Sequence, residues 1–353
     1  MADQRPSEST TSITAPTSTD AVPAAVLDIA DELFGPAPQH GVSLALVIQH
    51  RGRVVFERYG TQPDTLFGAG GPVGPETTLI SWSMAKSITH AAMGILVGDG
   101  AIDVSAQAPV ASWHGTDKQS ITIEQLLEMR SGLEFIEDYV DHSISNCIEM
   151  LYGAGQDDMA AYAAGLPLIH RPGSVWNYSS GTTNIVARII GDVLGSGDDG
   201  GRREMEAFLS DRLFGPIGMT SAIPKFDPAG TFVGSSYVFA TARDFARFGQ
   251  LYLDDGVVDG HRILPAGWRN HARLPVSFDD EGGFGYGRQW WLWPQYEGSL
   301  ACHGFEGQFI VVLPDRDLVV VHLGKSPAEA RQPLLAALRG IIDAYAPEPG
   351  GPN

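Results

Sequence analysis

Hydrophobic and aromatic patterns near both ends of the chain predict β-strands, and residues 42–49 alternate between apolar and polar positions. The strand-like segments are residues 42–49, 54–59, 286–293, 308–313 and 318–323. The first two are expected to form a hairpin, and the apolar residues of its first strand are expected on one face: Val42, Leu44, Leu46 and Ile48. Residues 60–78 are rich in Gly and Pro and are expected to form a loop.

Between these strands, apolar residues recur at the spacing of helices. The helical segments lie near residues 81–97, 122–131, 157–164, 182–194, 203–213, 241–253 and 327–345. Thr122 and Gln125 form a capping-box pattern, and Thr241 suits the cap of its helix. The helix near 81–97 is expected to be amphipathic, with Met84, Ile88, Ala91, Ala92 and Ile95 on one arc and Ser83, Lys86 and His90 on the other.

Strands at both ends of a helical middle predict an α+β fold, in which one antiparallel sheet is flanked by helices and an all-α lobe is inserted. The sheet domain is expected at residues 25–100 and 275–346, and the mainly helical lobe at residues 101–274. Residues 1–24 are rich in Ser, Thr, Ala and Pro and have no apolar core, so we expect a disordered tail and not a signal peptide. A flexible tail is expected at residues 347–353.

Charge and cysteine content narrow the function classes. A formal charge of −19 disfavours nucleic acid and anionic membrane surfaces, because both need basic patches on the protein. Two cysteines, Cys147 and Cys302, are too few for a disulfide framework, and their spacing fits no metal motif. No run approaches the ~18 apolar residues of a membrane helix. We therefore expect a cytoplasmic protein with no membrane and no nucleic-acid partner.

The first candidate for chemistry is the pair Ser83 and Lys86, which a helix would place on neighbouring positions of one surface. A serine hydroxyl is a poor nucleophile unless a nearby group takes its proton, and a neutral lysine amine can do so. Ser-x-x-Lys also arises by chance. However, the chain has four lysines against nineteen arginines, so lysine is not its usual surface cation and Lys86 needs an explanation.

Two further segments carry residues suited to the same chemistry. Tyr178 precedes a helix, where a phenol beside a lysine can relay protons, although a half-buried ring with a satisfied hydroxyl is the alternative. Residues 302–308 lead into a strand and are flanked by glycines, so their backbone can approach a substrate and offer an N–H to an oxyanion. A bulge with no role is equally compatible with that pattern.

In this order and at these separations, the three motifs resemble those of the serine penicillin-recognising superfamily. The motifs are Ser83-x-x-Lys86, Tyr178-Ser179-Ser180 and His303-Gly304-Phe305. That group includes class C β-lactamases, D-alanyl-D-alanine carboxypeptidases and related esterases and amidases. Shorter sequence segments are similar to those of 6-aminohexanoate-dimer hydrolases. These segments are residues 129–133, 137–139, 234–241 and 303–308. The resemblance covers roughly residues 40–345.

The resemblance implies a β-lactamase/transpeptidase-like fold with the site in a cleft between the sheet and the helical lobe. It implies that Ser83 is the acylated nucleophile, that Lys86 is its general base and that Tyr178 shares proton transfer to the leaving group. The backbone N–H groups of Ser83 and Phe305 would form the oxyanion hole. No metal or cofactor is implied. The expected partner is a small-molecule substrate, and the sequence does not decide whether the protein forms a homodimer.

Two departures from the superfamily pattern bear on the substrate. Ser180 stands where the second motif usually has Asn, and Cys302-His303-Gly304 stands where the third usually has Lys-Thr-Gly. Cys302 cannot supply a cation for a carboxylate, and His303 can do so only when protonated. The pattern therefore favours an amidase or esterase acting on linear substrates. Its alternatives are a β-lactamase-like carboxylesterase, a D-alanyl-D-alanine carboxypeptidase or β-lactamase, and a binding protein that has lost catalysis.

Substrate contacts are expected from residues near these motifs. The candidates are Tyr139, Ser180, Tyr237, Trp290, His303 and Gly304. The aromatic residues between 286 and 296 suit a wall of an acyl pocket, and they equally suit the core of the sheet. For Tyr139, simple exposure to solvent is the alternative.

Overall fold

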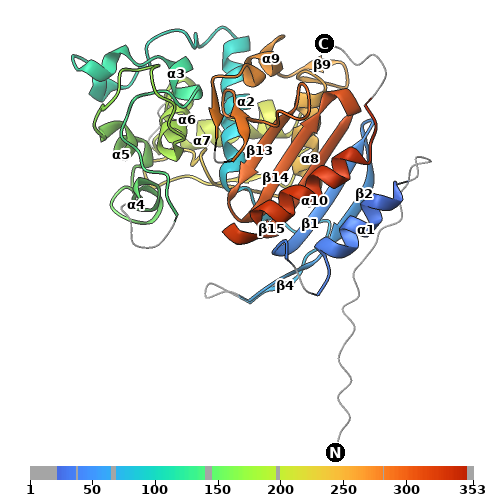
Figure 1. Cartoon of the computed structure of the whole chain (residues 1–353). Helices are drawn as coiled ribbons and strands as arrows, with labels where there is room; N and C mark the ends of the chain where they lie inside the picture. Colours follow the sequence, from blue (N-terminus) through green and yellow to red (C-terminus); the bar gives the residue numbers. More distant parts are fainter. Residues whose placement is uncertain are drawn as a thin grey trace, which may run out of the picture.

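The computed structural model describes residues 22–36, 39–64, 69–139, 145–195, 199–280 and 282–347. The tails predicted at 1–24 and 347–353 lie almost entirely outside these ranges. Figure 1 shows a large sheet on one side of the molecule and a group of helices, α3 to α6, on the other. The boundaries expected for the two domains stay a prediction.

One eight-stranded antiparallel sheet is built from both ends of the chain, as predicted. Its strand order is β10-β11-β12-β13-β14-β15-β1-β2. The strands are β1 (Val42–His50), β2 (Arg53–Tyr59), β10 (Ser277–Asp279), β11 (Phe284–Tyr286), β12 (Trp291–Leu292), β13 (Leu300–Gly304), β14 (Gln308–Leu313) and β15 (Leu318–Lys325). β1 pairs with β15, so the N-terminal hairpin extends the C-terminal sheet. The predicted strand at 286–293 is wrong in its bounds, because residues 287–290 form the connection between β11 and β12.

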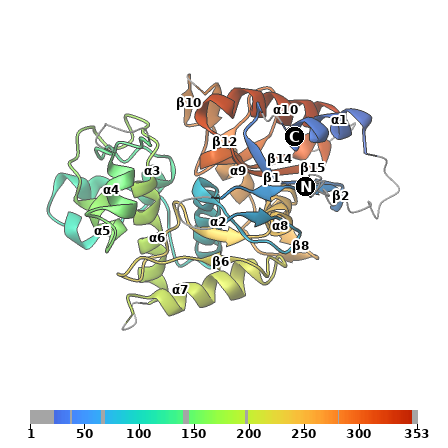
Figure 2. The same cartoon turned by 90° about the horizontal axis from the view of Figure 1, so that it is seen from below.

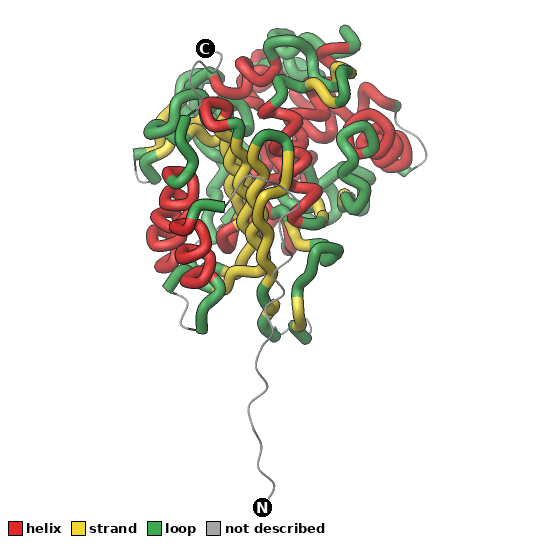
Figure 3. The backbone as a smooth tube through the Cα atoms, turned by 90° about the vertical axis from the view of Figure 1, so that its right-hand side faces the viewer, coloured by secondary structure: helices red, strands yellow, loops and turns green. Residues whose placement is uncertain are grey.

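Helices cover both faces of this sheet (Figures 1 and 3). α1 (Ala24–Leu33) and α10 (Arg331–Asp343) pack on one face, and α8 (Ala242–Leu253) packs on the other. Successive side chains of β14 alternate between the two cores, since Phe309 joins the α1 and α10 side while Ile310 joins the α8 side. Both faces are therefore buried, as in a three-layer arrangement.

The single face predicted for the first strand is wrong, because Val42 and Leu44 pack on the side opposite Leu46 and Ile48. The pairing of β1 with β15 shifts register between Ser43 and Ala45. A bulge adds one residue to a strand and so reverses the side-chain directions beyond it. As a result Leu44 packs in the core on the α8 side, whereas Leu46 and Ile48 pack against α1 and α10.

The remaining helices follow local signals at several of their ends. Thr122 caps α3 with the predicted capping box, and the Thr241 side chain caps α8. α3 ends at Leu127, short of the predicted end near 131. α1 and α4 were not predicted. The other helices are α2 (Ala85–Gly98), α3 (Ile123–Leu127), α4 (Asn146–Tyr152), α5 (Met159–Gly165), α6 (Ser180–Leu194), α7 (Arg202–Phe208) with the π-helical η4 (Leu209–Phe214), and α9 (Trp268–Arg273).

Short elements complete the described chain. The 3-10 helices are η1 (Trp82–Met84), η2 (Ala111–Trp113), η3 (Asp117–Ser120), η5 (Phe305–Gly307), η6 (Pro314–Arg316) and η7 (Ala328–Ala330). The small sheets are β3 (Thr61–Gln62) with β4 (Gly71–Pro72), β5 (Leu79–Ile80) with β7 (Val238–Ala240) and β6 (Ile223–Pro224), and β8 (Val257–Val258) with β9 (His261–Arg262). In the part of the chain described, no helix combines the length and apolar character needed to span a membrane.

α2 lies between the helical group and the large sheet (Figures 1 and 2). Every residue from Ala85 to Leu96 is buried, so the polar arc predicted for this helix faces other parts of the protein and not solvent. Its polar residues have buried partners instead of water. For example, the ring nitrogens of His90 lie 2.7 Å from the Tyr252 hydroxyl and 3.2 Å from Nδ1 of His271. Burial lowers the pKa of His90 well below its usual value, so this imidazole is neutral.

Candidate active site

Ser83 lies in η1, directly before α2, and Lys86 lies one turn further on. The Lys86 ammonium donates to Ser83 Oγ at 3.0 Å, to Ser180 Oγ at 2.9 Å and to the Ser235 carbonyl at 3.0 Å. Lys86 is only 2% exposed. A neutral amine has two N–H groups and one lone pair, so it could keep the bonds to Ser180 and Ser235 while accepting the Ser83 proton. The geometry thus suits proton transfer from Ser83 to Lys86.

Tyr178 lies beside this pair on the segment that leads into α6. Lys86 Nζ is 4.9 Å from the centroid of the Tyr178 ring. Burial raises the pKa of Tyr178, although the charge of Lys86 and hydrogen bonding to Ser83 and Lys86 oppose this. The phenol is therefore protonated at neutral pH and can act as an acid. The rings of Trp176, Tyr286 and Trp291 hold it in place.

The Glu137 carboxylate is connected to Lys86 through the Ser180 hydroxyl, and it was not predicted as part of the site. It accepts from the Ser180 backbone N–H at 2.7 Å and from the Ser180 hydroxyl at 2.5 Å. The Tyr139 hydroxyl donates to the same carboxylate. The Ser180 hydroxyl therefore links Lys86 to Glu137 and is not directed to a substrate, which differs from the contact predicted for Ser180.

The edge of β13 approaches η1 closely at Gly304. A Cβ atom at this position would lie 2.6 Å from the Ser81 carbonyl oxygen, so only glycine fits without displacement. The two segments are also joined by their side chains, since the Trp82 indole N–H lies 3.4 Å from the Glu306 carboxylate and the Trp82 and Phe305 ring centroids are 5.9 Å apart. Trp82 and Glu306 have φ values of 44° and 60°, which are uncommon outside glycine and cluster at functional sites.

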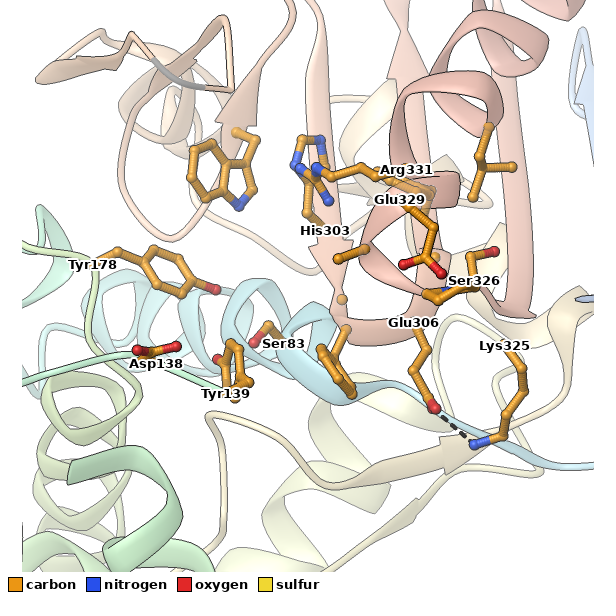
Figure 4. A pocket seen from close by; sticks show the side chains of 18 residues that line it. Ser83, Asp138, Tyr139, Tyr178, His303, Glu306, Lys325, Ser326, Glu329 and Arg331 are labelled. Carbon is orange, nitrogen blue, oxygen red and sulfur yellow. Dashed lines mark hydrogen bonds and ion pairs between the residues drawn. The ribbon is translucent and has the colours of Figure 1, made fainter. Parts of the chain in front are cut away.

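These segments enclose a cavity of about 910 Å³ (Figure 4). Ser83, Tyr178, Asp138 and Tyr139 line one part of it, as Figure 4 shows. Its other lining residues are Trp291, His303, Gly304, Phe305, Glu306, Gly307, Phe309, Lys325, Ser326, Pro327, Ala328, Glu329, Arg331 and Leu334. Tyr139 is 41% exposed and Phe305 is 47% exposed, and their ring centroids lie 5.2 Å apart. The two rings therefore contact each other, and both line the cavity.

Comparison with known proteins agrees with this arrangement. A family model described as Beta-lactamase matches residues 30–341. The chain belongs to the beta-lactamase family. Its relatives and fold are those of serine hydrolases, so the protein is a hydrolase of that family.

The similar proteins and structures differ in the reactions named for them. The 6-aminohexanoate-dimer hydrolase of Paenarthrobacter ureafaciens is 28% identical over 272 residues, which cover 72% of this chain and 67% of that protein. A Bacillus anthracis structure provisionally named a 6-aminohexanoate-dimer hydrolase has a TM-score of 0.70 and 24% identity, covering 85% of this chain and 78% of the other. A family VIII carboxylesterase structure has a TM-score of 0.69 and 15% identity, covering 93% of this chain and 100% of the other.

His303 does not supply the cation that the third motif of the beta-lactamase family usually carries. Its Nε2 accepts the Trp293 indole N–H at 2.8 Å, and its ring stacks on Trp291 at 5.1 Å. Burial lowers the pKa of His303 well below its usual value, and the charge of Arg331 adds to the effect. The imidazole is neutral at pH 7, so His303 carries no positive charge that could bind a substrate carboxylate.

Three of the expected substrate contacts, Ser180, Trp290 and Tyr237, are not among the residues that line the cavity. Trp290 is completely buried, and its ring lies 4.3 Å from Tyr252 and 6.0 Å from Phe248 on α8. Trp291, the first residue of β12, lines the cavity instead. The Tyr237 hydroxyl pairs with that of Tyr152, and Tyr237 is not among the lining residues. Tyr139, His303 and Gly304 do line it.

The described residues include no group of three or more His, Cys, Asp or Glu arranged to hold a metal ion. Cys147 and Cys302 are both buried free thiols. Burial and the nearby Glu137 raise the pKa of Cys147 to about 12, so this thiol is not a competing nucleophile at neutral pH.

Proposed function

We propose that this hydrolase cleaves small linear amides or esters through an acyl intermediate on Ser83. The observation that carries the proposal is the 3.0 Å hydrogen bond between Lys86 Nζ and Ser83 Oγ, with Tyr178 beside it in a cavity open to a ligand. Lys86 takes the hydroxyl proton, and Ser83 Oγ attacks the carbonyl carbon. The resulting oxyanion is held by the backbone N–H groups of Ser83 and Phe305.

Breakdown of this tetrahedral intermediate needs a proton on the leaving group. The Tyr178 hydroxyl gives its proton to the leaving nitrogen or oxygen as the bond to carbon breaks, and the Lys86 ammonium returns a proton to Tyr178. Water then attacks the acyl carbon and gives a proton to the same relay, and Ser83 leaves as a hydroxyl. Each group ends in its starting protonation state.

The shape of the cavity supports an extended substrate. Aromatic walls from Trp291, Tyr139 and Phe305 suit an aliphatic chain, and a volume of about 910 Å³ is large enough to hold one. The named activity of the Paenarthrobacter relative, hydrolysis of 6-aminohexanoate dimers, is the amide reaction that such a cavity fits best.

Labelling of the nucleophile tests the proposal. A fluorophosphonate should add one adduct to the intact chain, and peptide mapping should place it on Ser83. Ser83→Ala should remove both the adduct and the hydrolysis of p-nitrophenyl esters and 6-aminohexanoate oligomers, with an unchanged circular dichroism spectrum. Labelling at another residue, or ester hydrolysis that survives Ser83→Ala, contradicts the mechanism.

A carboxylesterase is the second candidate, supported by the open cavity and by the likeness to the family VIII carboxylesterase fold. Relative kcat/KM values for matched esters and amides decide between the two. A β-lactamase or carboxypeptidase is the third, and nitrocefin turnover equal to ester turnover would favour it. A cytoplasmic location and a homodimer stay predictions, which cell fractionation and light scattering test.

A further inference from the structure

Three hydrogen-bond donors meet the side chain of Glu137, which lies in the segment between α3 and α4. The Ser180 backbone N–H donates to Oε2 at 2.7 Å, and the Ser180 hydroxyl donates to Oε1 at 2.5 Å. The Tyr139 hydroxyl also donates to Oε1. A backbone N–H can only donate and a carboxylate can only accept, so the direction of these bonds is fixed.

The Ser180 hydroxyl has a single proton, and Glu137 takes it. Lys86 Nζ lies 2.9 Å from the same hydroxyl oxygen. With its proton directed to Glu137, the Ser180 oxygen can only accept from Lys86. Ser180 and Lys86 are 1% and 2% exposed, so bulk water does not offer that proton another acceptor.

The remaining contacts of Lys86 then determine which way its lone pair points. The Ser235 carbonyl, 3.0 Å from Nζ, is also only an acceptor, so a neutral amine gives its two N–H groups to Ser180 and Ser235. Its lone pair is left for the third contact, Ser83 Oγ at 3.0 Å. If the Ser180 proton pointed at Lys86 instead, it would occupy the lone pair and an N–H would face Ser83. Such an amine cannot take the Ser83 proton.

We propose that Glu137 is a positioning residue that keeps the neutral Lys86 amine oriented as a base toward Ser83. Glu137 acts through the Ser180 hydroxyl and is not among the residues that line the cavity. This role depends on the proposed function, because it assumes that Lys86 is the base for Ser83. It adds to the site a residue that lies outside the three motifs.

Two substitutions separate the direction of the hydrogen bond from the size of the side chain. Glu137→Gln keeps the size, but the Ser180 backbone N–H holds the amide oxygen and leaves the NH₂ group facing the Ser180 hydroxyl. That NH₂ donates to the hydroxyl oxygen and displaces the Ser180 proton toward Lys86. Glu137→Asp is one methylene shorter, but its carboxylate can still only accept.

Kinetics of these variants on p-nitrophenyl esters test the role. We expect Glu137→Gln to lower kcat by about 10- to 100-fold with little change in KM, the range for one hydrogen bond to a charged group, and Glu137→Asp to lose less. A side chain that only fills space would give the opposite order. Adding Glu137→Gln to Ser180→Ala should cause no further loss, and Glu134→Gln, at an exposed carboxyl group of the same segment, should keep the wild-type kcat. Greater activity in Glu137→Gln than in Glu137→Asp, or additive losses in the double variant, overturns the proposal.

Neutron diffraction tests the same hydrogen bond without any reaction. In the wild type, the Ser180 hydroxyl deuteron should lie between Ser180 Oγ and the Glu137 carboxylate. In Glu137→Gln it should point to Lys86. This pair of results supports the positioning role even where Ser83 fails to label with a fluorophosphonate. A wild-type deuteron directed to Lys86, or the same direction in both proteins, overturns it even where Ser83 labels as proposed.

Discussion

Lys86 has three oxygen partners, and only one of them belongs to the proposed nucleophile. Removing the amine leaves the Ser235 carbonyl and the Ser180 hydroxyl without their buried donor and leaves Ser83 without a base. Lys86→Ala should lower kcat/KM for p-nitrophenyl esters by about 10²- to 10⁴-fold, the usual contribution of a general base. Steady-state kinetics measure the loss, with circular dichroism as the control for folding. Retention of more than a tenth of the activity would exclude Lys86 as the base.

Ser180 connects the lysine to Glu137, and its neighbour Ser179 provides a matched comparison. Ser180→Ala removes the hydroxyl that donates to the Glu137 carboxylate and accepts from Lys86, so we expect kcat to fall by about 10- to 100-fold. The Ser179 hydroxyl instead caps α6 through the Thr182 N–H, so Ser179→Ala should cost about 1 kcal/mol of stability. Kinetics and denaturant unfolding of both variants separate the two roles. The same loss of kcat in both variants would mean that Ser180 only supports the helix.

At the scale of whole elements, the approach of β13 to η1 determines where the Phe305 backbone lies. Gly304→Ala would place a methyl group 2.6 Å from the Ser81 carbonyl oxygen and push the strand edge away from Ser83. We expect kcat to fall by about 10²- to 10³-fold, as when an oxyanion donor is lost. Gly191→Ala on α6 is the matched control, because its added methyl group meets open space. Full activity in Gly304→Ala would show that the oxyanion does not depend on this strand edge.

Elements with local signals could be predicted from the sequence, and elements defined by distant contacts could not. The apolar run over residues 309–313 and the cap at Thr241 correspond to β14 and to the start of α8. The burial of α2 depends on two layers that pack around it, and the bulge in β1 depends on its pairing with β15. Neither contact leaves a periodic pattern in the sequence.

The same distinction applies to the candidate site. Ser83 and Lys86 are one helical turn apart, so their proximity could be read from their spacing, and the family resemblance added Tyr178. Glu137 and Arg331 reach the site from a loop and from the C-terminal helix. An acidic or basic residue in such a segment looks like an ordinary surface charge until the tertiary packing is known.

Across the whole molecule, three buried histidines connect stability to pH. Burial lowers the pKa of His90 and His303 well below 6.5 and that of His322 to about 4. Each contributes stability that is fully present above the unfolded-state pKa near 6.5. This contribution is lost as the pH falls toward the folded-state pKa, because the unfolded chain binds the proton first. Buried carboxyl groups with raised pKa, such as Glu128 and Asp227, act in the opposite sense at lower pH.

A single substitution isolates the histidine contribution from the carboxyl groups. His322 is fully buried and contacts the Ser43 hydroxyl and the Gly307 carbonyl, so His322→Gln removes one such group while leaving the carboxyl groups in place. Between pH 6 and 5, the free energy of unfolding of the wild type should change with pH more steeply than that of the variant. The difference should be about 1.4 kcal/mol per pH unit, the value for one proton. The exposed His114 supplies the control, since His114→Gln should keep the wild-type slope. Parallel slopes for wild type and His322→Gln in urea unfolding would mean that His322 is already protonated in the folded protein at pH 6.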